Sequence, residues 1–307
     1  MYKRQSVGNQ ASLRLEDFID IFLEERHVRA IGLHIEAIHD TEKFASAAMR
    51  AIEKNIPIVA LKTGVSEIGA RLTTSHTGSL SGTDATYSAF FKRLGICRVA
   101  TPSELVELLK FLTIAGVPTG PKIAGFTCSG GGATMLADSA APLELDFVQP
   151  SSHTATALTQ LLPHTATVTN PLDYTTPIWG DYERTLPVFK CLLKDEYDSA
   201  VLVQDYPAAG LDESKPHYRA DSDSFIKACR IANIPAAICS TLPENLDAET
   251  RSHVLQAGVA PMQGIETCME AINAAANYGK RRAVLLANPP HPFRRAEVMG
   301  SRFRQLD

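Results

Sequence analysis

NIPIVALKTG, residues 55–64, decides the fold, because a short apolar run here ends in a polar turn with glycine. A run of this length bounded by turn residues is typical of a strand in a parallel sheet. The stretch follows a helix-length segment and is echoed by NIPAAICSTL at 233–242, which also follows one. Both halves of the chain are therefore expected to consist of strand–helix units.

Strand-like and helix-like segments alternate along the whole sequence. This alternation predicts an α/β fold, in which helices cover both faces of parallel sheets. Ligands of such folds gather at the carboxyl ends of the strands, so the loops that follow the strands are the places to search for a site. The expected strands are 30–36, 56–62 and 96–100 in the first half, and 122–128, 199–204, 234–240 and 259–263 in the second.

The two halves resemble each other beyond this stretch, which indicates an approximate tandem repeat. The segment 96–116 parallels 259–279, and the polar turn 6–13 parallels 167–174. Chance similarity between short α/β sequences is the alternative. The second half opens with KIAGFTCSGGGATMLADSAA, a strand, glycine turn and helix without a counterpart in the first half. We therefore expect the first domain to lack its opening βα unit and the chain to be truncated at its start.

The composition is that of an ordinary globular protein. The 307 residues are 45% hydrophobic, and a net charge of −4 without a dense lysine and arginine stripe argues against nucleic-acid binding. No apolar run approaches the ~20 residues that cross a membrane, and the amino terminus lacks a signal pattern. Six cysteines without CxxC spacing argue against a zinc site or a disulfide framework. We expect a cytoplasmic protein without metal, membrane or nucleic-acid partners.

A long polar stretch follows the strand that ends at Lys62 and contains His76 in its middle. Connections in compact domains normally have ~2–6 residues, and longer loops are mostly functional. A neutral imidazole is a nucleophile that can accept a phosphoryl group, and Thr77, Gly78 and Ser79 offer donors to an anion. The alternative, which composition alone favours, is a surface-loop histidine without a role.

Glu36 ends the first clear strand and so points to the edge where ligands gather. A carboxylate there can accept the second N–H of an imidazole, fix its tautomer and stabilise the charge that phosphorylation brings. The alternative is a carboxylate that caps the following helix. His34 and His39 flank Glu36 without a spacing that suits a metal, and we interpret both as incidental.

A further loop, CSGGGAT, joins a strand to a helix through Ser129, Gly130, Gly131 and Gly132. Successive glycines let backbone N–H groups approach an anion, and the helix dipole adds positive potential. The alternative is a tight turn that only needs glycine. Neither a dinucleotide fingerprint nor a Walker A loop is present.

Asn170 and Asp173, in the stretch TNPLDYT, precede a helix that Asp181 is expected to cap. A polar turn and a wall of the site are equally good interpretations of these two residues. Trp179, which follows them, is interpreted as a packing residue rather than a substrate contact.

Together these stretches resemble the NDP-forming acyl-CoA synthetases, the family that includes ADP-forming acetate–CoA ligase and is related to succinyl-CoA synthetase. The resemblance covers nearly the whole sequence from Ser6. Several long motifs in the right order are more specific than any one glycine loop. The motifs are SVGNQASLRLEDFIDIF, IGLHIEAIHD, PIVALKTGVSEIGARLTTSHTGSLSGTDATYSAFFKRLGICRV, TCSGGGATMLADSA, TNPLDYTTPIW and STLPENL.

The resemblance implies a reversible phosphohistidine relay. In such enzymes phosphate attacks an acyl-CoA, the acyl phosphate passes its phosphoryl group to a histidine, and the histidine delivers it to ADP. By motif match His76 is that histidine, and Glu36, in IEAI where the family usually has EGI, is its orienting carboxylate. The turn Ser129–Gly132 is the helix start that cradles the phosphoryl group.

The resemblance also implies the domain plan: two tandem flavodoxin-like, succinyl-CoA synthetase-like domains at 6–116 and 120–279, the first of which carries the phosphohistidine. Residues 280–307 are then a linker towards an ATP-grasp domain. A CoA-binding Rossmann domain and an ATP-grasp domain or subunit complete such enzymes, which use CoA and ATP or ADP with Mg²⁺. We expect this chain to be a central fragment that binds none of these cofactors alone and is inactive alone. In the complete enzyme, an oligomer, it would act on a small carboxylic acid.

Two other functions stay open at this point. A protein lysine acyltransferase could use the same scaffold, although the intact His76 favours the ligase because an acyltransferase needs no phosphoryl carrier. A non-catalytic ligand-binding or assembly module would bind an anion without needing His76. Which acyl group is used does not follow from the sequence.

Overall fold

The computed structural model describes residues 6–8, 10, 12–77, 83–207 and 213–290, with the backbone alone for 73–77. Its helices and strands alternate and form two parallel sheets. Every strand expected from the sequence is present, with ends within two residues of those expected. The α/β class is therefore confirmed.

Three parallel strands form the first sheet, in the order β1-β2-β3. Three helices cover one face of it and share with it an apolar core that includes Ile19, Phe44 and Phe91. A fourth helix, α5, packs on the other face through Leu108 and Phe111. The elements are α1 (Leu15–Leu23), β1 (Ile31–Ile35), α2 (Thr41–Glu53), β2 (Ile58–Lys62), α4 (Asp84–Leu94), β3 (Cys97–Val99) and α5 (Pro102–Ile114).

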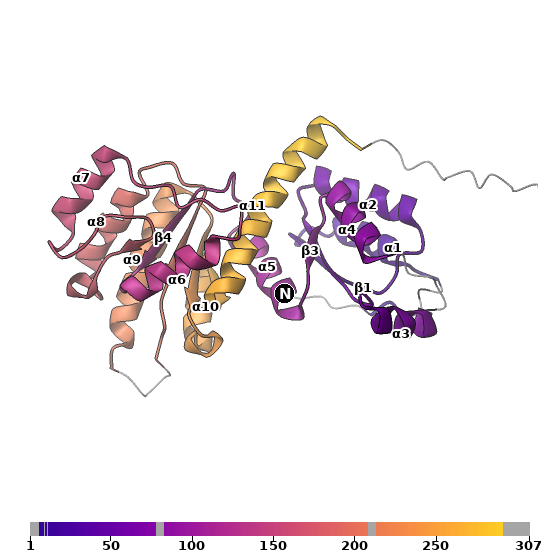
Figure 1. Cartoon of the computed structure of the whole chain (residues 1–307), viewed down its shortest axis with the longest axis horizontal. Coiled ribbons are helices and arrows are strands. Elements are labelled where there is room, and N and C mark those ends of the chain that lie inside the picture. Colours follow the sequence, from indigo (N-terminus) through magenta and orange to yellow (C-terminus); the bar gives the residue numbers. More distant parts are fainter. Residues whose placement is uncertain (1–5, 9, 11, 78–82, 208–212, 291–307) are drawn as a thin grey trace, which may run out of the picture.

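The long loop expected after β2 is wrong in its first part, because Glu67–Thr77 forms helix α3. The Ser66 hydroxyl accepts a hydrogen bond from the N–H of Gly69 at 3.1 Å, which satisfies one of the free donors at the helix start. Glu67 and Arg71, one turn apart, form an ion pair on its surface. The helix lies at the edge of the molecule, beside the end of β1 (Figure 1).

Five parallel strands form the second sheet, in the order β5-β4-β6-β7-β8. This order is that of flavodoxin-like folds. The strands β6, β7 and β8 correspond to β1, β2 and β3, whereas β4 and β5 have no counterpart among the described residues of the first sheet. The elements are β4 (Ile123–Thr127), α6 (Gly130–Ala140), α7 (Ser152–Leu161), β5 (Leu172–Asp173), α8 (Tyr182–Leu192), β6 (Ser199–Val203), α9 (Lys215–Ala232), β7 (Ala236–Ser240), α10 (Ala248–Gln256), β8 (Ala260–Gln263) and α11 (Ile265–Ala287), with short 3₁₀ turns at Thr176–Ile178 and Pro243–Asn245.

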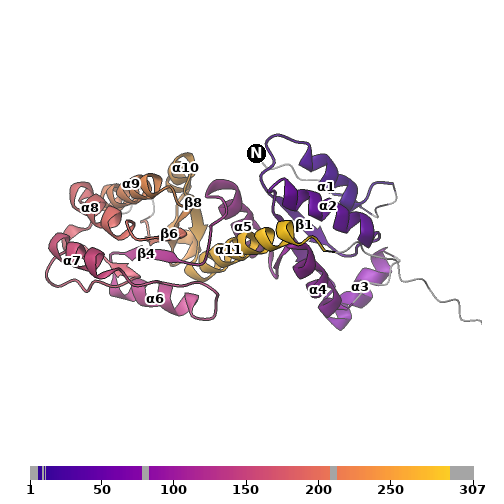
Figure 2. The same cartoon turned by 90° about the horizontal axis from the view of Figure 1, so that it is seen from above.

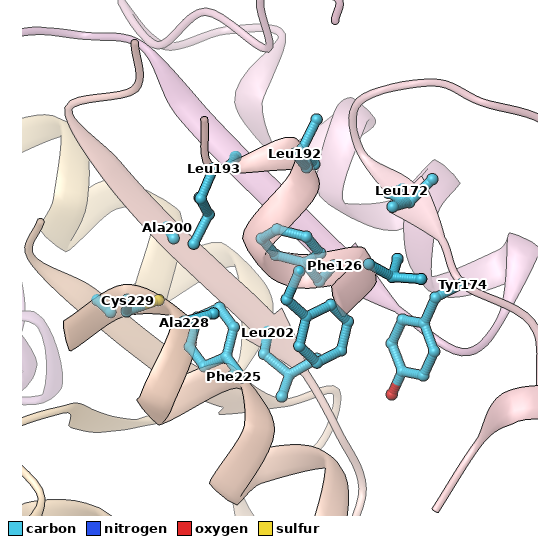
Figure 3. Close-up of a cluster of buried hydrophobic side chains, with 14 of the residues drawn as sticks. Phe126, Leu172, Tyr174, Leu192, Leu193, Ala200, Leu202, Phe225, Ala228 and Cys229 are labelled. Carbon is cyan, nitrogen blue, oxygen red and sulfur yellow. The ribbon is translucent and has the colours of Figure 1, made fainter. Parts of the chain in front are cut away.

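An aromatic cluster fills the second sheet's core on the side of α8 and α9. The ring of Phe126, on β4, meets the rings of Phe189 and Phe225 edge-on, with centroid distances of 4.9 and 5.7 Å. Tyr174 meets Phe189 in the same way at 5.0 Å. Figure 3 shows Phe126, Tyr174 and Phe225 of this cluster between the strands and the helices. The cluster anchors β4, and with it the glycine turn that follows β4.

Helices α5 and α11 join the two sheets. A single apolar cluster includes Val59 and Leu61 of the first sheet and Val201 of the second, with α5 and α11 between them. The far end of α11 reaches the first sheet's helices, as Figures 1 and 2 show. There Arg281 and Arg282 donate to the last carbonyls of α4 and α2. Cationic groups at helix carboxyl ends stabilise the helix dipoles, so this contact ties the two halves together.

The course of α11 bears on the linker expected at 280–307. The helix continues to Ala287, and Leu285 is buried against Ile52. Residues 280–287 are therefore helical, with most of them exposed and Leu285 buried. The division of the chain into domains stays a prediction.

The described residues also show the state of the cysteines and whether a metal site or a membrane-spanning helix is present among them. All six cysteines are free thiols. Within the described ranges, no group of three or more histidine, cysteine, aspartate or glutamate side chains has the arrangement of a metal site. The same ranges contain no helix of the length and apolar character needed to cross a membrane.

Candidate functional site

The carboxyl edge of the first sheet brings Glu36 and Lys62 to the ends of neighbouring strands. Glu36 directly follows β1 and is exposed, whereas Lys62 is the last residue of β2 and is buried. The strands stay paired up to this edge, because the N–H of Thr63 donates to the carbonyl of Ile35 at 3.0 Å. His34 Nε2 lies 3.1 Å from Thr63 Oγ1, so His34 helps to hold the start of the following loop.

His76 lies in the last turn of α3, the helix that follows the carboxyl end of β2. Its 11 residues give a length of ~16 Å, at 1.5 Å per residue. The side chains of His76 and Thr77 lie outside the described residues, and Gly78 and Ser79 lie outside them entirely. The contact between His76 and Glu36 therefore stays a prediction.

Lys62 is a residue of this edge that the sequence analysis missed. It is only 5% exposed, its ammonium donates to the carbonyl of Thr63, and Nζ lies 4.6 Å from the centre of the Tyr87 ring. Burial lowers the pKa of Lys62, and the negative charges of Asp84 and Glu36 act in the opposite direction. The sequence does contain a signal for this residue, since Lys62 ends the otherwise apolar strand IVALK. Charged residues are rarely buried without a function or a partner.

Arg98 and Asp84 form a charged pair beside Lys62. The Arg98 guanidinium donates to the Asp84 carboxylate and to the Ser88 hydroxyl, and also to the Asp84 carbonyl at 3.4 Å. The Tyr87 hydroxyl accepts a hydrogen bond from the N–H of Ile38 at 3.2 Å. Arg98 thus engages the carboxylate of Asp84, and Tyr87 is fixed to the loop after β1.

The glycine turn of the second sheet forms the start of α6. Ser129 is the N-cap residue, and its hydroxyl accepts a hydrogen bond from the N–H of Gly132 at 3.4 Å. Ser129, Gly130 and Gly131 are exposed, whereas Gly132 is buried. The first N–H groups of a helix have no partner within it, so those of Gly130 and Gly131 can bind an anion.

Gly132→Ala is expected to destabilise the chain by ~1–3 kcal/mol, the range for overpacking. A Cβ at Gly132 would lie 2.6 Å from Thr127 Oγ1 and 3.3 Å from Thr127 Cβ, so α6 would have to move away from β4. The matched control is Gly131→Ala, whose Cβ would meet Ser129 Oγ no closer than 3.6 Å. Urea unfolding measures both variants, and equal stabilities would contradict this close approach.

The side chain of Asn170 binds backbone groups within the second sheet. It is 3% exposed; Oδ1 accepts from the N–H of Gly125 at 2.9 Å, and Nδ2 donates to the carbonyl of Ile123 at 2.8 Å. The structure thus gives Asn170 a structural role, and its place in a wall of the site stays a prediction. Asp173, in contrast, borders the glycine turn, because its Oδ2 lies 3.6 Å from where a Cβ on Gly130 would be.

A buried polar network lies next to Cys128, the residue before the glycine turn. The hydroxyl of Tyr174 donates to Asp221 Oδ2 at 2.7 Å, and the N–H of Gly180 donates to Oδ1 at 2.9 Å. Burial raises the pKa of Asp221 to about 6 and the pKa of the Cys128 thiol to about 11. A thiol with a raised pKa is a weak nucleophile, so Cys128 is not a candidate for covalent chemistry.

The two candidate regions belong to different sheets. Within the described part of the chain, no hydrogen bond or ion pair joins Glu36 or Lys62 to the glycine turn. Joint action of both regions on one phosphoryl group therefore stays a prediction.

Comparison with known proteins shows which proteins the chain is similar to. Residues 2–112 match the family model described as the succinyl-CoA ligase like flavodoxin domain. The ADP-forming acetate–CoA ligase of Methanocaldococcus jannaschii is 35% identical over 168 residues, which are 55% of this chain and 24% of that protein. The alpha subunit of ADP-forming acetate–CoA ligase II from Pyrococcus furiosus is 36% identical over 191 residues, 62% of this chain and 41% of that protein. Over these regions the chain is similar to ADP-forming acetate–CoA ligases, and its first part matches the succinyl-CoA ligase like flavodoxin domain.

The chain also has the fold of a solved structure, the dinucleotide forming acetyl-coenzyme A synthetase 1 of Ca. Korarchaeum cryptofilum in complex with phosphate and ADP. The TM-score is 0.79 at 23% identity, over 93% of this chain and 60% of that chain. The likeness, together with the observed strand orders, confirms the expected fold of two tandem flavodoxin-like parallel-sheet units. The chain spans 24% and 41% of the length of the two curated relatives.

Proposed function

We propose that this chain acts within an ADP-forming acyl-CoA synthetase, as the part that carries the phosphohistidine at His76. The observation that carries the proposal is the arrangement of α3 and Glu36 at the carboxyl edge of the first sheet. Helix α3, which bears His76, follows the end of β2, and Glu36 follows the adjacent β1. Parallel sheets bind ligands at this edge.

The proposed reaction has three reversible steps. Inorganic phosphate attacks the thioester carbonyl of an acyl-CoA, which forms an acyl phosphate and releases the CoA thiol. A nitrogen of His76 attacks the phosphorus of the acyl phosphate, which forms a P–N bond and releases the carboxylate. An oxygen of the ADP β-phosphate then attacks the same phosphorus, which yields ATP and restores the imidazole.

Each remaining site residue has a role in this proposal. Glu36 accepts the second N–H of the imidazole and stabilises the positive charge that grows as the P–N bond forms. The start of α6 receives the phosphoryl oxygens at the N–H groups of Gly130 and Gly131, where no Cβ blocks the approach. Asp173 borders that position and limits how far an anion can enter.

The complete enzyme needs partners for this sequence of steps. CoA and the nucleotide, with Mg²⁺, would bind to a Rossmann domain and to an ATP-grasp domain or subunit, and a small carboxylic acid would be the acyl substrate. One relative named above is itself called a subunit, which supports an assembly of several parts. The six free thiols fit a reducing compartment, so the cytoplasm is the proposed location.

The test is phosphorylation of the chain when it is combined with its CoA-binding and ATP-grasp partners. ATP labelled on the γ-phosphate should transfer one label per chain, stable in alkali and labile in acid as P–N bonds are. Mass spectrometry of peptides should place it on His76. Absence of label, or an acid-stable label on a serine or threonine, would overturn the proposal.

Glu36→Gln is expected to slow this phosphorylation on the order of 10²-fold, because the amide carries no charge to stabilise the imidazolium. The rate of label incorporation in a rapid-quench experiment is the measurement. Glu42→Gln is the matched control, since Glu42 is an exposed acid in the first turn of α2. An unchanged rate in Glu36→Gln would remove Glu36 from the mechanism.

A further inference from the structure

We propose that the ammonium group of Lys62 binds an oxyanion at the carboxyl end of β2, the inorganic phosphate or the phosphoryl group of the reaction. The inference deepens the proposed function and rests on it for the identity of the ligand. Lys62 is then a binding residue of the same edge that carries Glu36.

Lys62 places a buried positive charge at this edge, and no carboxylate of the described residues pairs with it. Lys62 is 5% exposed, and among the described residues no carboxylate lies within 4.0 Å of its ammonium. Lys110 is the informative comparison, because it is also buried, at 9% exposed, and has the Glu107 carboxylate at 2.6 Å. A buried ammonium is costly unless it is paired. The environment of Lys62 is therefore completed by an anion that the described residues do not supply.

Neither of the two nearby carboxylates, Asp84 and Glu36, pairs with the ammonium of Lys62. Asp84 is engaged by the guanidinium of Arg98, which also binds the Ser88 hydroxyl. Glu36 acts on Lys62 only through space, without a hydrogen bond between them. Burial lowers the pKa of Lys62 in spite of both acids, so the charged form still lacks compensation. A bound dianion would raise that pKa.

The ammonium of Lys62 is held in place by two neighbouring groups. Its hydrogen bond to the carbonyl of Thr63 and the face of the Tyr87 ring, 4.6 Å away, fix Nζ at the end of β2. Tyr87 is in turn fixed by the N–H of Ile38. An ammonium has three N–H donors, and the carbonyl of Thr63 accepts from one of them. Among the described residues nothing accepts from the other two, so they can donate to a ligand.

Lys62 also lies at the position where the predicted site residues meet. β2 is the central strand of the first sheet, so its end lies between the ends of β1 and β3. The predicted orienting carboxylate follows β1, and α3 with His76 follows β2 itself. A single buried cation at this point suits one small oxyanion rather than a polyanion, which needs clustered cations.

The experiment titrates inorganic phosphate into the purified 307-residue chain and follows binding by calorimetry or by ³¹P line width. Lys62→Met, which keeps the apolar stem and removes the charge, is expected to weaken binding about 10- to 100-fold, the scale for losing a charged hydrogen bond. Lys54→Met is the matched control, because Lys54 is a partly exposed lysine paired with Glu24. It should bind phosphate as the unchanged chain does.

A second measurement keeps the test valid if Lys62→Met does not fold. Reductive methylation of the unchanged chain, read by mass spectrometry, should be slowed by phosphate at Lys62 and not at Lys54. An acetate titration separates the two oxyanion sources, since weaker protection by acetate than by phosphate identifies the phosphoryl group. Equal or stronger protection by acetate would assign the site to the acyl carboxylate and overturn the assignment to phosphate.

The outcomes separate this inference from the proposed function. Phosphate binding that is absent in the unchanged chain, or unaffected by Lys62→Met, overturns the role of Lys62 even if His76 is labelled. Phosphate binding that depends on Lys62 while His76 remains unlabelled supports the anion site and overturns the phosphohistidine.

Discussion

His76→Ala is expected to abolish phosphorylation of the chain in the assembled enzyme. The proposed covalent bond forms to an imidazole nitrogen, and alanine offers no atom that can replace it. No acid-labile label should be detected from γ-labelled ATP, or from labelled phosphate with an acyl-CoA. Net conversion of acyl-CoA to carboxylate with synthesis of ATP should stop as well, because the phosphohistidine links the two half-reactions.

His39→Ala is the matched control for this substitution. His39 is an exposed histidine at the same edge of the first sheet, between β1 and α2. Its replacement should leave the amount of label unchanged, which separates the loss of the nucleophile from the loss of any histidine at this edge. Label that persists in His76→Ala would show that another group accepts the phosphoryl, and the assignment of His76 would fail.

Phe126→Ala is expected to lower the free energy of unfolding by ~3–5 kcal/mol, the range for removing a buried aromatic ring. Phe126 is fully buried on β4 and meets Phe189 and Phe225 at centroid distances of 4.9 and 5.7 Å. Figure 3 shows its ring within the aromatic cluster. Loss of the ring removes apolar burial, two edge-on aromatic contacts and the packing that holds β4. Urea unfolding followed by circular dichroism measures the change.

Met135→Ala provides the comparison for Phe126→Ala. Met135 lies on α6, the helix that follows β4, and is 43% exposed. A substitution at such a surface position should change the free energy of unfolding by less than ~0.5 kcal/mol. A similarly small effect of Phe126→Ala would mean that the second sheet does not depend on the aromatic cluster.

The strands could be predicted because their signal is local. All five residues of Ile123–Thr127 are buried, and an apolar run of that kind is visible in the sequence without knowledge of its neighbours. The short strand Leu172–Asp173 has no such run. It pairs with β4, and the preceding Asn170 binds backbone groups of that strand through its side chain. This is a long-range contact that a local pattern does not contain.

Helix α3 was missed for a different reason. Gly69 and the run Thr73–Ser75 have low helix propensity, so the segment was interpreted as a loop around His76. The Ser66 cap and the ion pair between Glu67 and Arg71 are the local signals that favour the helix. They were readable in the sequence, but the glycines and hydroxyl residues that follow outweighed them.

By itself, the sequence determined the strands of both sheets except Leu172–Asp173, and which chemical groups stand at their ends. Glu36 and Ser129 were placed at strand ends correctly, because the end of an apolar run marks the end of a strand. Only the tertiary structure decided the surroundings of Lys62 and Lys110. Both lysines are buried, yet Glu107 pairs with Lys110, whereas no carboxylate in the described part of the chain pairs with Lys62. Burial and charge pairing depend on which distant segments meet, and for Lys62 those are the ends of β1 and β3 and the start of α4.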